Sequence, residues 1–334
     1  MHFTAQDIIP PLPMRILLIK TSSLGDVVHN LPVVTDLRAN FPNAAIDWVV
    51  EEAYTDIVGL HPDVRHSIPV ALRRWRKSLL DANTWRELRA FRAGLQMQSY
   101  DSVIDTQGLL KSALLARMAR GRRCGYAASS AREPISARLY DACFEVPNDL
   151  HAVARNRQLA ALAAGYAVAA APVYGITVPP ATEGSPCGTP TLAGPHAVLL
   201  TATSRDDKLW PEASWIALGH ALHGRGLTCL LPSGSGTERE RAKRLAQVIP
   251  DAVALPPMGL RELAGQLAGA RIVVGVDTGL VHLAAALGRP TLALFAASDP
   301  TLTGVLAAAP AINLGRRGEP PPVDAVLAAA MPLI

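Results

Sequence analysis

The chain has 334 residues, of which 49% are hydrophobic and only 5% aromatic, and its formal net charge is +4 at pH 7. This length suits two domains of about 150 residues each, with cores built mainly from Ala, Leu and Val. Four scattered cysteines without a CxxC pair argue against a disulfide framework or a zinc site. We expect no signal peptide, because residues 1–13 lack a basic start and an apolar core. We expect no membrane span either, because Pro172 interrupts the uncharged stretch 159–178.

The first half of the chain alternates predicted strands with predicted helices. Apolar runs predict strands at 14–20, 45–51 and 101–106. Helices are predicted at 25–40, 84–98, 109–119 and 151–165. Strands that alternate with helices indicate a parallel sheet.

The loop after the first predicted strand, residues 20–32 (KTSSLGDVVHNLP), is the most informative motif. Asp26 follows Gly25 where a helix begins, so its carboxylate points into the crevice where α/β folds bind ligands. A loop that cradles phosphate needs glycines and positive charge rather than a carboxylate. The motif therefore predicts a site for a hydroxyl-bearing substrate, with Asp26 placed to accept a proton.

The basic excess of the chain lies in residues 14–172 and forms two clusters. One is the RRWRK segment and the other comprises Arg117, Arg120, Arg122 and Arg123. Each cluster is either a solvated helix face or a patch for an anionic acceptor or an anionic membrane surface. Nucleic acid is not expected as a partner, because no recognition motif or aromatic stacking platform accompanies these residues.

The second half repeats the alternation of strands and helices. Strands are predicted at 197–203, 227–232, 271–276 and 291–296, and helices at 211–223, 237–248, 259–269 and 279–287. Residues 178–195, rich in Pro, Gly, Ser and Thr, have the composition of a linker. We therefore predict an α/β protein with two Rossmann-like domains that face each other across a cleft.

Two loops of the second half follow predicted strands and carry residues suited to a nucleotide. The loop 201–211 (TATSRDDKLWP) offers the Thr203 and Ser204 hydroxyls and the Lys208 ammonium group to phosphates. In the segment 231–244 (LPSGSGTERERAKR), Glu238 lies in the first turn of a helix and can accept hydrogen bonds from ribose hydroxyls. The alternatives are an ordinary charged loop and an acidic residue that compensates the helix dipole.

The third loop lies in residues 273–290 (VVGVDTGLVHLAAALGRP) and carries the strongest signal of the three. Gly279 lets the backbone approach a phosphate at a helix N-terminus, Asp277 faces sugar hydroxyls, and His282 lies nearly one turn further on. Alternatively, Asp277 and Thr278 only cap the helix, and His282 is a core histidine.

These motifs, together with DTQGLLKSALLAR and SAREP, resemble the lipopolysaccharide heptosyltransferase family over nearly the whole chain, from about residue 14 to about 303. The SSLGD, RRWRK and SRDDKLWP segments resemble the member that adds the first heptose. The resemblance implies an inverting transferase of the GT-B fold that moves L-glycero-D-manno-heptose from ADP-heptose onto Kdo of Kdo-lipid A. It further implies a peripheral enzyme on the cytoplasmic face of the Gram-negative inner membrane, without a metal or another cofactor.

The resemblance also implies how the chain is divided. Residues 14–177 form the acceptor domain, 178–195 the linker and 196–310 the donor domain, and the segment 311–334 can cross back to the first domain. Asp26 corresponds to the catalytic base and Lys208 to the catalytic residue at the diphosphate. The implied donor contacts are Thr203, Ser204, Lys208, Glu238 at the ribose, Met258 beside the adenine, Asp277, Thr278, Gly279 and His282. The implied acceptor contacts are Ser22, Ser23, Gly25, Arg73, Arg74, Arg76, Lys77 and Arg132.

Several other functions remain open at this point. Within the family, the chain is alternatively a second or later heptosyltransferase. A sugar-nucleotide epimerase or hydrolase of the same fold is disfavoured by Asp26 and the basic clusters. A non-catalytic nucleotide-sugar binding protein would lack the base that Asp26 provides.

Overall fold

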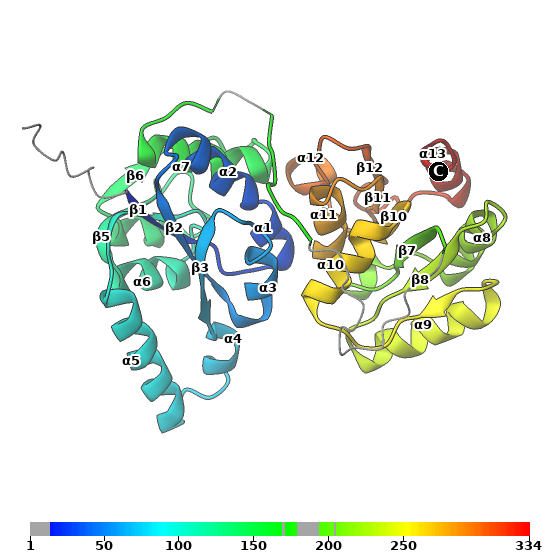
Figure 1. Cartoon of the computed structure of the whole chain (residues 1–334), viewed down its shortest axis with the longest axis horizontal. Coiled ribbons are helices and arrows are strands. Elements are labelled where there is room, and N and C mark those ends of the chain that lie inside the picture. Colours follow the sequence, from blue (N-terminus) through cyan, green and yellow to red (C-terminus); the bar gives the residue numbers. More distant parts are fainter. Residues whose placement is uncertain (1–13, 169–170, 179–193, 204) are drawn as a thin grey trace, which may run out of the picture.

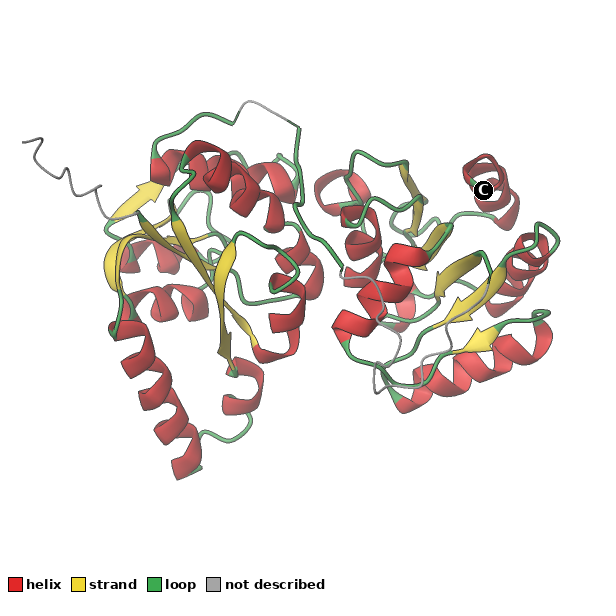
Figure 2. Ribbon diagram, in the orientation of Figure 1, coloured by secondary structure: helices red, strands yellow, loops and turns green. Residues whose placement is uncertain are grey.

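The computed structural model of the chain describes residues 14–168, 171–178, 194–203 and 205–334. Two parallel six-stranded sheets, each flanked by helices, lie side by side (Figures 1 and 2). One sheet is built from the first half of the chain and the other from the second half. The predicted α/β fold with two Rossmann-like units is thereby confirmed.

The first sheet has the order β3-β2-β1-β4-β5-β6. Its strands are β1 (Arg15–Ile19), β2 (Ala45–Glu51), β3 (Val64–Val70), β4 (Ser99–Asp105), β5 (Arg120–Tyr126) and β6 (Ala142–Phe144). Its helices are α1 (Leu24–Val28), α2 (Leu31–Asn40), α3 (Thr55–Val58), α4 (Leu72–Trp75), α5 (Ala82–Gln96), α6 (Leu110–Met118) and α7 (Ala152–Ala164). The central strand β1 pairs with β2 and β4, so its apolar residues 16–19 are fully buried.

The predicted helix 25–40 is two helices in the structure, α1 and α2. His29 caps the first, Asn30 caps the second, and Pro32 lies in the first turn of α2. Pro32 lacks a backbone N–H and cannot continue the hydrogen-bond ladder of α1, so the chain begins a new helix there.

The strands β3, β5 and β6 were not predicted, and the sequences of β3 and β5 explain why those two were missed. Pro69 lies in β3, which is an edge strand where proline is tolerated. Arg120, Arg122 and Arg123 of the second basic cluster lie in β5, where only Cys124–Tyr126 are buried. Without apolar alternation, neither segment has the pattern of a half-buried strand.

The second sheet has the order β12-β11-β10-β7-β8-β9. Its strands are β7 (His196–Leu200), β8 (Thr228–Leu231), β9 (Val253–Ala254), β10 (Ile272–Val276), β11 (Thr291–Leu294) and β12 (Ala311–Leu314). Its helices are α8 (Glu212–His223), α9 (Gly236–Val248), α10 (Leu260–Gly269), α11 (Gly279–Ala286), α12 (Pro300–Thr303) and α13 (Val323–Ala330). Every predicted helix and strand of this half is present, and the short strands β9 and β12 are additional.

The C-terminal helix α13 packs on the second half of the chain, against α8 and β11 (Figure 1). Val326 and Ala330 of α13 are buried in the same apolar cluster as Trp215 of α8. The expected crossing of this segment to the first half is therefore wrong, because its apolar face is already covered by the second half. The linker residues 179–193 lie outside the described residues, and the predicted domain limits stay a prediction.

Candidate active site

A cavity of about 1120 Å³ lies between the two halves and is lined by both. Its wall includes Lys20 and Asp26, which follow β1, and Thr106, which follows β4. From the second half it includes Thr203 beyond β7 and Asp277 directly after β10. Because parallel strands end at the same edge of a sheet, the loops of both sheets meet here, as the α/β fold predicts.

Asp26 lies in the first turn of α1 and faces the cavity. Its Oδ2 accepts hydrogen bonds from the Ser23 backbone N–H at 2.8 Å and from Ser23 Oγ at 3.1 Å. Its Oδ1 accepts no hydrogen bond from the described residues. The carboxylate is thus held by one oxygen, and the other is free to accept a proton.

Gln107, just beyond β4, holds the loop that carries Asp26. Its Oε1 accepts from Thr21 N at 2.7 Å and from Thr21 Oγ1 at 2.8 Å, and its Nε2 donates to Ser22 O at 3.1 Å. Sequence reasoning missed this residue. Its position directly after the predicted strand 101–106 was the only available signal.

Lys20 is a second residue that the sequence analysis did not select. Its buried ammonium group donates to Thr106 O at 2.8 Å and to Asn156 Oδ1 at 3.2 Å, and it borders the cavity. Burial lowers the pKa of Lys20, while the nearby charge of Asp26 opposes that shift. A lysine at the end of a fully apolar strand was the missed signal.

In the second half, Lys208 and Asp277 form an ion pair of 2.6 Å between Nζ and Oδ2. Ser298 Oγ donates to the same carboxylate oxygen, and Thr203 Oγ1 donates to the backbone oxygen of Asp277 at 3.2 Å. All four residues line the cavity. The ammonium group of Lys208 therefore borders the cavity while it is paired with the Asp277 carboxylate.

Glu238 both caps α9 and lines the cavity. Its Oε2 accepts from Gly234 N at 2.7 Å and from Ser235 N at 3.2 Å. The capping role and the predicted ligand role are therefore compatible. Met258 also lines the cavity, whereas Ser204 lies outside the described residues.

The start of α11 meets α1 across the gap between the halves. A Cβ added at Gly279 would lie 2.6 Å from Leu24 Cβ and 2.8 Å from Gly25 N, so Gly279 permits the close approach of these helices. Thr278 is the N-cap of α11, but its side chain makes no capping hydrogen bond, and it borders the cavity.

His282 of α11 belongs to a cluster of three histidines built by both halves. Its Nδ1 lies 3.1 Å from Nε2 of His29, and the His29 ring centroid lies 5.5 Å from that of His151. His151 Nε2 in turn donates to Gly304 O at 3.0 Å. Burial lowers the pKa of His282 to about 4 and that of His29 well below its usual range. His29 and His151 were not predicted.

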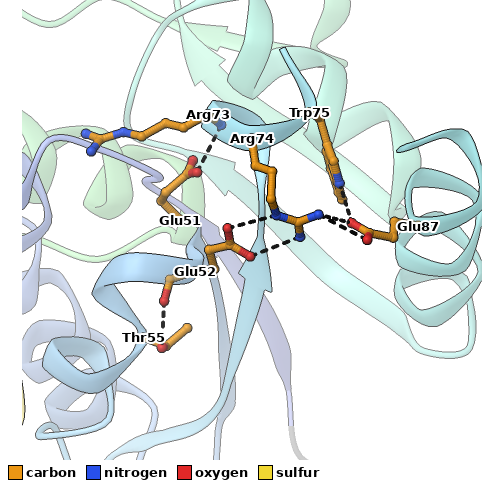
Figure 3. Close-up of polar contacts among 7 residues, drawn as sticks. All are labelled: Glu51, Glu52, Thr55, Arg73, Arg74, Trp75 and Glu87. Atoms are coloured by element: carbon orange, nitrogen blue, oxygen red, sulfur yellow. Dashed lines mark hydrogen bonds and ion pairs between the residues drawn. The ribbon is translucent and has the colours of Figure 1, made fainter. Parts of the chain in front are cut away.

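The predicted acceptor residues divide into two groups. Ser23, Gly25, Arg73 and Arg132 line the cavity, whereas Ser22, Arg74, Arg76 and Lys77 lie outside its lining. The guanidinium group of Arg74 pairs with Glu52 at 3.2 Å and with Glu87 at 2.7 Å, and Trp75 Nε1 also donates to Glu87 (Figure 3). Figure 3 shows the Arg73 side chain extending from α4 in a different direction from Arg74.

The described ranges contain neither a metal-binding cluster nor a membrane-spanning helix. No group of three or more His, Cys, Asp and Glu side chains is arranged there to hold a metal ion. No helix within those ranges has both the length and the apolar character needed to cross a bilayer.

Comparison with known proteins identifies the family. Residues 88–326 match the protein-family model described as glycosyltransferase family 9 (heptosyltransferase). Lipopolysaccharide heptosyltransferase 1 of Escherichia coli K12 is 44% identical over 299 residues, which cover 87% of this chain and 90% of that protein. The structure of E. coli heptosyltransferase WaaC with ADP has a TM-score of 0.88 and 40% identity over 96% of this chain and 100% of its own. The structure of E. coli WaaC with ADP-2-deoxy-2-fluoro heptose has a TM-score of 0.82 and 42% identity over 91% of this chain and 94% of its own. The chain therefore belongs to glycosyltransferase family 9, the heptosyltransferases.

Proposed function

We propose that the chain transfers L-glycero-D-manno-heptose from ADP-heptose to Kdo of Kdo-lipid A, with inversion at the anomeric carbon. One observation carries the proposal: Asp26 of the first half and the Lys208–Asp277 pair of the second half face one cavity. The 44% identical relative named for lipopolysaccharide heptose transfer, and the WaaC structure with a fluorinated ADP-heptose, support this choice of substrates.

The donor binds to the second half, residues 196–310. Lys208 contacts the diphosphate, aided by the backbone N–H groups at the start of α11. The free carboxylate oxygen of Glu238 accepts hydrogen bonds from the ribose, and Met258 packs beside the adenine. Thr203, Ser204, Thr278 and His282 complete the surroundings of the diphosphate and heptose.

The acceptor binds to the first half, residues 14–177, at the cytoplasmic face of the inner membrane. Arg73 and Arg132 on the cavity wall supply positive charge for the Kdo carboxylate and the lipid A phosphates. The enzyme attaches peripherally to the anionic membrane surface, and nucleic acid is not a partner.

In the reaction, Asp26 Oδ1 takes the proton of the acceptor hydroxyl as its oxygen attacks the anomeric carbon. The bond from that carbon to the diphosphate oxygen breaks at the same time, and ADP departs from the opposite face. Lys208 and the α11 N-terminus stabilise the negative charge that develops on ADP. The positive charge that stabilises the departing ADP therefore comes from Lys208 and the α11 N-terminus.

The test measures ADP release from ADP-heptose with and without Kdo-lipid A, for the wild type and Asp26→Asn. The asparagine keeps an oxygen for the Ser23 hydrogen bonds but cannot take the proton. We expect release only with acceptor, a loss of about 10²- to 10⁴-fold in the variant, and unchanged ADP-heptose affinity by calorimetry. Full turnover by Asp26→Asn, or a loss of donor affinity, would contradict the role of Asp26.

The same assay separates the alternatives. Release only with an already heptosylated acceptor identifies a second or later heptosyltransferase, and release without any acceptor identifies a hydrolase. Donor binding without release under any condition identifies a non-catalytic binding protein. We also expect activity to survive EDTA, so inhibition by the chelator would refute metal independence.

A further inference from the structure

The segment between α4 and α5 exposes apolar side chains at one end of the molecule. Leu80 is fully exposed, Leu79 is 55% exposed and Trp85 is 47% exposed. We call residues 76–86 the α4–α5 tip. In Figure 1 this tip lies at the lower end of the first half, away from the second half.

The tip has a defined structure. Trp85 Nε1 donates to Leu79 O at 2.8 Å, and Asp81 caps α5 by accepting from Asn83 N at 2.9 Å. Behind the tip, the contacts of Arg74 with Glu52 and Glu87 tie α4 to α5 and to the segment after β2 (Figure 3). The chain therefore holds these leucines in solvent instead of folding them into the adjacent core.

Cationic side chains outnumber acidic ones on the tip and along α5. The exposed side chains of Arg76, Lys77, Arg86, Arg89 and Arg92 lie on the tip and along α5. None of these five forms an ion pair with any residue that the structure describes. The nearby acids are engaged, since Asp81 caps α5 and Glu87 binds Arg74 and Trp75. With five exposed cations against the two acids Asp81 and Glu87, the tip and α5 are complementary to an anionic partner.

We propose that the α4–α5 tip inserts into an anionic lipid bilayer, with Leu79 and Leu80 among the acyl chains and Trp85 at the headgroup level. Aliphatic side chains at a projecting tip, an indole beside them and cations around both match the layers of a bilayer interface. A partner protein would need a matching acidic groove for the same segment.

The insertion places the cavity next to the membrane, and this step rests on the proposed function. Arg73 of α4 lines the cavity and lies six residues before Leu79. With the tip inserted, α4 lies at the headgroup level and the cavity mouth opens close to it. A lipid-anchored acceptor can then present its sugar to Asp26 while its acyl chains stay in the bilayer.

The experiment measures vesicle binding by the full chain and its Leu79→Ser/Leu80→Ser variant. The vesicles contain phosphatidylcholine with or without phosphatidylglycerol. The matched control is Met97→Ser, because Met97 is 82% exposed directly after the other end of α5. We expect the wild type and the control to sediment with the anionic vesicles and the double variant to bind about 100-fold more weakly.

Trp85 provides a direct readout of depth, because it is exposed while the other four tryptophans are buried. Brominated lipids should quench its fluorescence in the wild type but not in the double variant. Equal vesicle binding by both proteins, or no quenching, would overturn the proposal. A double variant that changes oligomeric state instead would also overturn it, by identifying the tip as a protein interface.

Turnover separates this proposal from the proposed function. The double variant should match the wild type with a soluble, deacylated Kdo acceptor and lose activity only with acceptor embedded in vesicles. If the wild type turns over neither acceptor, the proposed function fails while the vesicle result still decides the insertion. An equal loss with both acceptors would refute a membrane role for the tip.

Discussion

Acid should weaken the contact between the two halves, because His282, His29 and His151 are neutral in the folded protein. Burial is the main cause of the lowered pKa of His282, and His151 and Lys208 also oppose its protonation. The carboxylates Asp277 and Asp26 act in the opposite direction but do not offset burial. As the pH falls, the unfolded chain takes up protons before the folded protein does, so stability falls.

The size of this effect follows from the shift of the His282 pKa from 6.5 to about 4. Above about pH 7 neither state is protonated, and the full stability is present. Between pH 7 and 5, protonation linked to His282 lowers the free energy of unfolding by about 2 kcal/mol. Below pH 4 the total decrease is about 3 kcal/mol. Urea unfolding followed by circular dichroism at a series of pH values measures it.

The matched variant is His282→Asn, which keeps a polar side chain but does not titrate. Its loss of stability between pH 7 and 5 should be about 2 kcal/mol smaller than that of the wild type. Some loss should remain, because burial also lowers the pKa of His61, elsewhere in the first half, to about 4. An identical pH dependence in both proteins would refute the assignment to His282.

Four further substitutions test other parts of the site. Gly279→Ala places a Cβ 2.6 Å from Leu24 Cβ, so the two halves should separate. X-ray scattering should show a larger radius of gyration, and kcat should fall about tenfold. Unchanged turnover would contradict this. Lys208→Ala should weaken ADP binding by about 2 kcal/mol in calorimetry, and an unaltered Kd would exclude its contact with the diphosphate. Arg74→Ala should lower the melting temperature with little effect on the acceptor KM, whereas Arg73→Ala should raise that KM; the reverse pattern would show that their roles are exchanged.

The sequence allowed the fold and much of the candidate site to be predicted, because loops after apolar strands end at one edge of a sheet. Asp26 and Asp277 were found in this way, and both line the cavity. The ion pair of Asp277 with Lys208 was not predictable, since 69 residues separate its partners. The role of Lys20 was not predictable either, because the apolar run before it indicates only that a strand ends there.

Other misses have different physical causes. His29 and His282 come together only because the two halves meet at α1 and α11. Arg74 pairs with Glu52 and Glu87 because α5 lies beside α4 in the folded chain. The sequence alone shows only a cluster of basic residues and does not distinguish Arg74 from Arg73. The strands β3 and β5 lack alternation because one carries Pro69 and the other carries arginines.

The lengths of the outermost strands bear on how the protein behaves when crowded. An exposed sheet edge is a template for pairing with another chain and for fibril growth. Here three of the four edges are short, since β6 has three residues, β9 two and β12 four. The long edge strand β3 contains Pro69, which removes a backbone donor. Both sheets are therefore poor templates for intermolecular strand addition, even where many copies gather on one surface.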